Sequence, residues 1–79
     1  NSLLDFIYSL SLEYCHTILK EALKTKNLPT DIEFSIRMYC GGCVQILKEY
    51  ILNDACETPE MMTKYTCENI PSYIQKYFL

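Results

Sequence analysis

The apolar residues of this chain recur at helical spacing in three segments. In the first, apolar side chains follow one another at steps of three and four residues, which is the period of one helix face: Leu4, Tyr8, Leu12, Cys15, Leu19 and Leu23. The end of the segment is basic, as suits a helix C-terminus, and Pro29 follows it. The pattern predicts a helix over about residues 2–26.

The second segment, about residues 30–53, is apolar on two sides. One stripe consists of Ile32, Ile36, Tyr39, Cys43, Ile46 and Tyr50, and the other of Cys40, Val44, Leu47 and Ile51. Thr30 and Glu33 have the spacing of a capping box. A helix that is apolar nearly all round is buried on more than one side. Three helices alone cannot easily cover both sides, so one side is predicted to meet another chain.

The third segment, about residues 58–78, begins at Thr58-Pro59-Glu60, where threonine suits the N-cap and proline the first helical position. Pro71 is expected to kink or divide this helix at about Asn69. No alternating pattern bounded by turn residues predicts a strand. The sequence therefore predicts an all-α fold with three helices, and residues 1–79 form a single, partial domain.

Composition and charge limit the classes of partner that this chain is expected to bind. A chain of 79 residues with 49% hydrophobic residues is short enough to need a partner or a cross-link for stability. Its net charge is −3, and no basic face is present, which argues against direct binding of nucleic acid. The longest uncharged stretch, residues 38–47, is far shorter than the roughly 20 residues of a membrane span. We expect a cytoplasmic protein without a membrane segment.

Five cysteines form an odd set, whereas a secreted disulfide framework normally uses an even number. Free thiols are the simpler interpretation, and a small secreted, disulfide-stapled helical binding protein is the alternative. Cys40 and Cys43 form a CxxC motif, which a redox or metal protein could use. The motif lies in mid-helix with no strand before it, so buried packing is favoured.

A glycine pair and a single histidine are further candidates for a functional site. Gly41 and Gly42 each cost roughly 1 kcal/mol in a helix interior, which predicts a close approach at a helix crossing, a dimer interface or a pocket wall. His16, the one histidine, has no carboxylate or serine at a spacing that would indicate a catalytic pair. No catalytic triad, carboxylate pair or phosphate loop is visible, so no enzyme, cofactor or metal site is predicted.

Residues 36–51, with Thr58-Pro59-Glu60-Met61-Met62, carry a resemblance to a known family. The run at residues 37–52, Arg-Met-Tyr-Cys-Gly-Gly-Cys-Val-Gln-Ile-Leu-Lys-Glu-Tyr-Ile-Leu, overlaps this range and resembles the penultimate helix of TetR-type regulator C-terminal domains, in the DhaS-like branch. The second motif resembles the start of the last helix in that branch. Many relatives have tryptophan where this chain has Tyr50.

The resemblance implies a module of a bacterial transcription regulator. The last two helices would form a four-helix bundle with a second chain, which gives a two-fold homodimer. A small-molecule effector would bind in the core, and DNA would be bound only through an N-terminal helix-turn-helix domain, which is absent from this sequence. The predicted interface comprises Tyr39, Gly42, Cys43, Ile46, Leu47, Tyr50, Met62, Tyr65 and Ile70. The predicted effector contacts are Tyr8, Leu12, Cys15, Cys40 and Val44.

Overall fold

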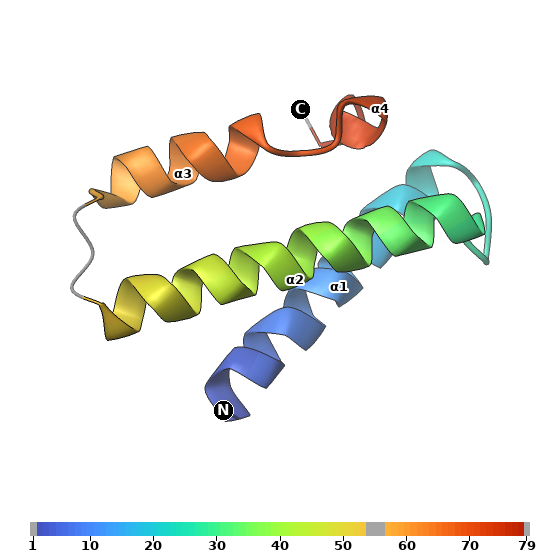
Figure 1. Cartoon of the computed structure of the whole chain (residues 1–79). Coiled ribbons are helices and arrows are strands. Elements are labelled where there is room, and N and C mark those ends of the chain that lie inside the picture. The colour runs from blue at the N-terminus through green and yellow to red at the C-terminus, as the bar shows by residue number, and fades with distance from the viewer. Residues whose placement is uncertain (1, 54–56, 79) are drawn as a thin grey trace.

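The computed structural model describes residues 2–53 and 57–78. The helices are α1 (Ser2–Ala22), α2 (Thr30–Leu52), α3 (Pro59–Glu68) and α4 (Ser72–Gln75) (Figure 1). Every regular element in these two ranges is a helix, which confirms the predicted all-α class. Figure 1 shows α1 crossing behind α2, while α3 runs alongside α2 in the opposite direction.

The core lies where α1 crosses α2. Its five buried side chains are Cys15 and Leu19 of α1, Ile36 and Cys40 of α2, and Ile74 of α4. Half-buried aliphatic and aromatic side chains, among them Tyr8 and Leu12, pack around this cluster. A core of five residues is small, so much apolar surface is left outside it.

Helix α1 ends at Ala22 rather than at the predicted Lys26, because the chain turns into a left-handed residue. Lys24 has a φ of 52°. The amide of Lys24 donates to the Glu21 carbonyl, and the amide of Thr25 donates to the Lys20 carbonyl. This is a Schellman motif, which closes the last turn of a helix and most often has glycine at the left-handed position. Lysine at that position gave no signal in the sequence.

The capping box predicted at the start of α2 is wrong. Pro29 occupies the N-cap position and no side chain caps the helix; Thr30 is its first residue. The Glu33 carboxylate lies instead 2.7 Å from Nε2 of His16 on α1. Because the Glu33 carboxylate binds a residue of another helix, it does not cap the start of α2. His16, for which the sequence suggested no partner, helps to join α1 to α2.

The predicted start and division of the third segment are both confirmed. The Thr58 hydroxyl accepts a hydrogen bond from the Met61 amide at 3.2 Å, and Pro59 is the first helical residue. Helix α3 stops at Glu68 with Asn69 as its C-cap, and α4 begins after Pro71. Helix α4 ends at Gln75, so the predicted continuation of helix to residue 78 is not observed.

Helix α3 stands apart from the core and has no buried residue. Two tyrosine hydroxyls of α2 hold this segment: Tyr39 donates to the Thr66 carbonyl at 2.6 Å, and Tyr50 donates to the Glu57 carbonyl at 3.1 Å. The molecule is thin, with extents of 42 × 26 × 16 Å. Among the described helices, none is both long enough and apolar enough to cross a membrane.

Candidate functional site: two apolar grooves

Two open grooves flank Tyr39. The α1 groove, of about 860 Å³, is lined by Leu10, Ser11, Glu13, Tyr14, Cys15, Thr17, Ile36, Tyr39, Cys40, Cys43, Thr66, Ile70, Ile74 and Phe78. The α3 groove, of about 910 Å³, is lined by Met38, Tyr39, Gly42, Cys43, Gln45, Ile46, Leu47, Glu57, Met62, Thr63, Tyr65, Thr66, Cys67 and Asn69. Tyr39, Cys43 and Thr66 belong to both grooves.

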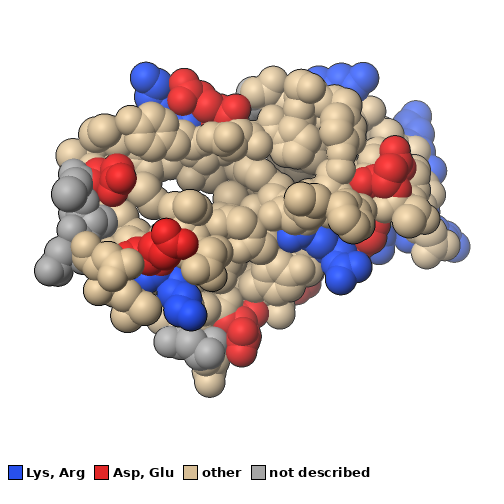
Figure 2. Space-filling model, viewed as in Figure 1, with Lys and Arg blue, Asp and Glu red and all other residues tan. Residues whose placement is uncertain are grey.

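The surface around the grooves is short of charge. Figure 2 shows a hollow between α3 and α2 that is bordered mostly by uncharged residues. Each groove has one acidic residue in its lining, Glu13 in the α1 groove and Glu57 in the α3 groove, and no basic residue. Both grooves therefore suit apolar occupants, either a small molecule or another protein surface.

The structure brings most of the predicted interface residues into one groove. Seven of the nine line the α3 groove: Tyr39, Gly42, Cys43, Ile46, Leu47, Met62 and Tyr65. Ile70 lines the α1 groove instead, and Tyr50 lines neither, because its hydroxyl is turned to the Glu57 carbonyl. Met38, an exposed residue of the α3 groove, was missed. Its place one residue before Tyr39, at the start of the apolar run of α2, was the available signal.

The predicted effector residues are spread more widely. Cys15 and Cys40 line the α1 groove. Tyr8 and Leu12 pack against the core cluster, since that face of α1 is used for the crossing with α2. Val44 is half-buried and lines neither groove. Leu10 and Tyr14, also of α1, line the α1 groove in their place.

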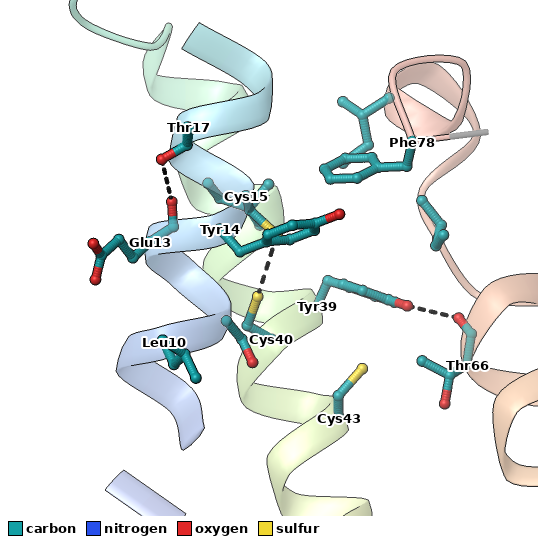
Figure 3. Close-up of a pocket in the computed structure, with 14 residues that line it drawn as sticks. Leu10, Glu13, Tyr14, Cys15, Thr17, Tyr39, Cys40, Cys43, Thr66 and Phe78 are labelled. Atoms are coloured by element: carbon teal, nitrogen blue, oxygen red, sulfur yellow. Dashed lines mark hydrogen bonds between the residues drawn. The ribbon is translucent and has the colours of Figure 1, made fainter. Parts of the chain in front are cut away.

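Tyr39 forms the wall between the two grooves. Figure 3 shows its ring extending from α2 toward α3, where the hydroxyl donates to the Thr66 carbonyl. Burial raises the pKa of the Tyr39 phenol well above its usual value of 10.0, and the nearby Cys43 thiol adds to the effect. The neutral phenol is therefore the form that the fold favours, and it is the form that can donate to the carbonyl.

The thiols pair differently from the CxxC spacing. The Sγ atoms of Cys15 and Cys40 lie 3.8 Å apart, whereas Figure 3 shows Cys43 directed toward α3. The hypothesis that Cys40 and Cys43 act as a redox or metal pair is therefore not supported. No group of three or more metal-binding side chains occurs among residues 2–53 and 57–78.

The disulfide-stapled alternative also lacks support. The four cysteines that the structure describes, Cys15, Cys40, Cys43 and Cys67, are all free thiols. Cys56 lies outside the described residues.

Hydrogen bonding sets the pKa values of the buried thiol pair. The hydrogen bond between the two thiols lowers the pKa of Cys15 from its usual 9.0, against the opposing effect of burial. The same bond, together with burial, raises the pKa of Cys40 far above 9.0. Burial raises the pKa of Cys43, and a hydrogen bond with Tyr39 opposes that effect. Of this pair, Cys15 is thus the thiol that more readily becomes a thiolate.

The two glycines differ in their surroundings. A Cβ atom on Gly41 would lie 3.8 Å from a ring carbon of Tyr8, which is ordinary van der Waals contact. A Cβ atom on Gly42 would meet nothing within 4 Å. A close approach inside one chain therefore explains neither glycine. Gly42 faces the open α3 groove.

Comparison with known proteins relates the chain to a family. A family model described as "Transcriptional regulator C-terminal region" matches residues 1–72. No protein of curated function and no solved structure matches the chain significantly.

Proposed function

We infer the function of this chain from its family, because the chain belongs to the TetR-type transcriptional regulators and corresponds to their C-terminal region. Such regions are not normally enzymes. We propose that this one is the dimerisation and effector-sensing module of a bacterial, cytoplasmic regulator. Because the chain is acidic, DNA binding is assigned to a separate helix-turn-helix domain. Assignment to the DhaS-like branch stays a prediction that rests on residues 36–51 and 58–62.

The observation that carries the dimer proposal is the amount of exposed surface. The chain exposes 5969 Å², whereas a compact folded monomer of 9.3 kDa exposes about 5000 Å². The excess is roughly 1000 Å², and a stable protein–protein interface covers about 800 Å² on each partner. The excess exposed surface of this flat molecule is therefore large enough to form one such interface.

The α3 groove is where a second copy would bind. It combines the exposed apolar side chains of Met38, Ile46 and Tyr65 with the open backbone at Gly42. A two-fold axis would place the same patch of each chain against the other. Helices α2 and α3 of both chains would then form a four-helix bundle, with the missing cover of the apolar α2 supplied by the partner.

The α1 groove is the proposed effector site. Its volume of about 860 Å³ lies within the range of pockets for small molecules. Aliphatic and aromatic side chains dominate its lining, and hydroxyls from Tyr14 and Tyr39 supply polar contacts. An apolar small molecule of modest size fits this lining. Because Tyr39 also lines the α3 groove, a ligand that moves its ring would change the proposed interface.

The test is the mass of the purified protein in solution, measured by sedimentation for the wild type and two variants. Ile46→Glu places a charge in the α3 groove, where the side chain is 54% exposed. Ile51→Glu is the matched control, because Ile51 is 58% exposed on α2 and lines neither groove. We expect dimers for the wild type and Ile51→Glu, and monomers for Ile46→Glu.

Circular dichroism checks that both variants keep their helix content, so that loss of the dimer is not loss of the fold. A wild type that remains monomeric through its whole concentration series contradicts the dimer proposal. A dimer that Ile51→Glu disrupts and Ile46→Glu does not would place the interface on another face of α2.

A further inference from the structure

Two thiols from different helices meet inside the fold. Cys15 of α1 is 8% exposed and Cys40 of α2 is 3% exposed, and their Sγ atoms are 3.8 Å apart. Both residues line the α1 groove, and Figure 3 shows the two sulfur atoms directed at each other. The pair is thus shielded from bulk solvent but lies at the wall of an open apolar groove.

We propose that Cys15 and Cys40 are a redox pair that an organic hydroperoxide, bound in the α1 groove, oxidises to a disulfide. This inference goes beyond the proposed dimerisation and effector sensing. It concerns covalent chemistry at two named sulfur atoms, and it does not depend on the oligomeric state.

The geometry permits the bond. A disulfide has an S–S distance of about 2.05 Å, so the two sulfur atoms must approach by less than 2 Å from their separation of 3.8 Å. Rotation of the two side chains, with a small shift of α1 on α2, would supply this approach. The bond would join residues 25 positions apart and tie α1 to α2 at the centre of the core.

The reaction proceeds in two balanced steps. The Cys15 thiolate attacks one oxygen of the hydroperoxide, the O–O bond breaks, and the alkoxide leaves and takes up a proton to become an alcohol. Cys15 is then a sulfenic acid. The Cys40 thiol attacks the Cys15 sulfur, the S–S bond forms, and the hydroxyl leaves with the thiol proton as water. Two thiols and one hydroperoxide thus give one disulfide, one alcohol and one water.

The surroundings select both the nucleophile and the class of oxidant. The hydrogen bond with Cys40, at an Sγ–Sγ distance of 3.8 Å, lowers the pKa of Cys15, which favours the thiolate there. Leu10, Ile70 and Phe78 give the α1 groove an apolar lining. Such a lining concentrates a hydroperoxide with an apolar organic group more than it concentrates hydrogen peroxide.

The experiment treats the purified wild-type protein with cumene hydroperoxide, blocks the remaining thiols with iodoacetamide and maps the peptides by mass spectrometry. We expect a Cys15–Cys40 disulfide and a fall from five titratable thiols to three. Hydrogen peroxide at the same concentration should act more slowly. Equal or faster reaction with hydrogen peroxide overturns the choice of an organic oxidant, and a reduced Cys15–Cys40 pair beside an oxidised Cys67 overturns the proposal.

Variants separate the two roles. In Cys40→Ser the sulfenic acid on Cys15 has no resolving thiol, so it should be trapped by dimedone. Cys15→Ser should form no disulfide and no dimedone adduct at Cys40. Cys67→Ser is the control, because Cys67 is exposed and lies outside the α1 groove, and it should form the disulfide as the wild type does. The wild-type peptide map decides the question even where a core variant folds poorly.

Discussion

At the scale of single residues, Tyr39 links the parts of the molecule. Its ring separates the two grooves, and its hydroxyl holds α3 through the Thr66 carbonyl. Because the phenol is held in its neutral form, the same hydrogen bond also makes the fold sensitive to alkali. One side chain therefore affects the position of α3 and the shape of both proposed binding surfaces.

Tyr39→Phe should lower the free energy of unfolding by about 0.5–1.5 kcal/mol near neutral pH, since it removes one hydrogen bond. It should also flatten the loss of stability in alkali. The folded-state pKa of Tyr39 is raised above 10.0, so above pH 10 the native state binds more protons than the unfolded state. Stability must then fall as pH rises, and the phenylalanine variant lacks this contribution.

Denaturant titrations at pH 8, 10 and 11 measure the effect. Cys40 and Cys43, whose pKa values are also raised from 9.0, should leave a residual decline in both proteins. Tyr73→Phe, a change at an exposed tyrosine, is the control. Identical slopes for the wild type and Tyr39→Phe between pH 10 and 11 would show that the phenol does not couple to folding.

At this scale the sequence predicted burial better than pairing. Buried packing was predicted for Cys40 and Cys43; Cys40 is buried, whereas Cys43 is half-buried and lines both grooves. The contact of Cys15 with Cys40 across 25 residues depends on where α1 crosses α2, and no local pattern contains that information. The same holds for His16 and Glu33, which meet across 17 residues.

At the scale of elements, the sequence predicted those helix boundaries that depend on residues close by in the chain. Thr58 and Pro59 start α3 through a hydrogen bond three residues away, and Pro71 divides the last segment because it cannot continue a helix. The C-terminal end of α1 was misplaced because Lys24 adopts a left-handed conformation. Helix α2 begins at the predicted residue, but its predicted capping box was wrong because Glu33 binds another helix. These choices depend on the packing of the whole chain.

The glycines allow a prediction about α2. Gly42→Ala should weaken the dimer, since the added methyl group would enter the α3 groove, where a partner is proposed to approach. Gly41→Ala adds the same helix-stabilising change of roughly 1 kcal/mol against Tyr8, inside one chain, and should leave the dissociation constant unchanged. Sedimentation at several concentrations gives both constants. Equal constants for the two variants would remove Gly42 from the proposed interface.

At the scale of the whole molecule, a thin shape and a five-residue core make stability depend on association. A dimer that folds and assembles together gains about 0.7 kcal/mol per chain for each tenfold rise in concentration, which corresponds to roughly 3–6 °C in melting temperature. The wild type should show this rise in scanning calorimetry. Ile46→Glu should melt at one temperature throughout, and a concentration-independent wild type would mean that the single chain is sufficient.

The loose attachment of α3 has a consequence for the motions of the protein. The Tyr39 hydroxyl binds the α3 backbone, the Tyr50 hydroxyl binds the Glu57 carbonyl just before α3, and α3 has no buried side chain. The helix can therefore open without disturbing the crossing of α1 and α2. In a hydrogen-exchange experiment, the amides of α3 would exchange through such local openings. The amides around Leu19 and Ile36 would exchange only through global unfolding. Assembly would then complete the folding of α3, and its exchange protection would report on the partner.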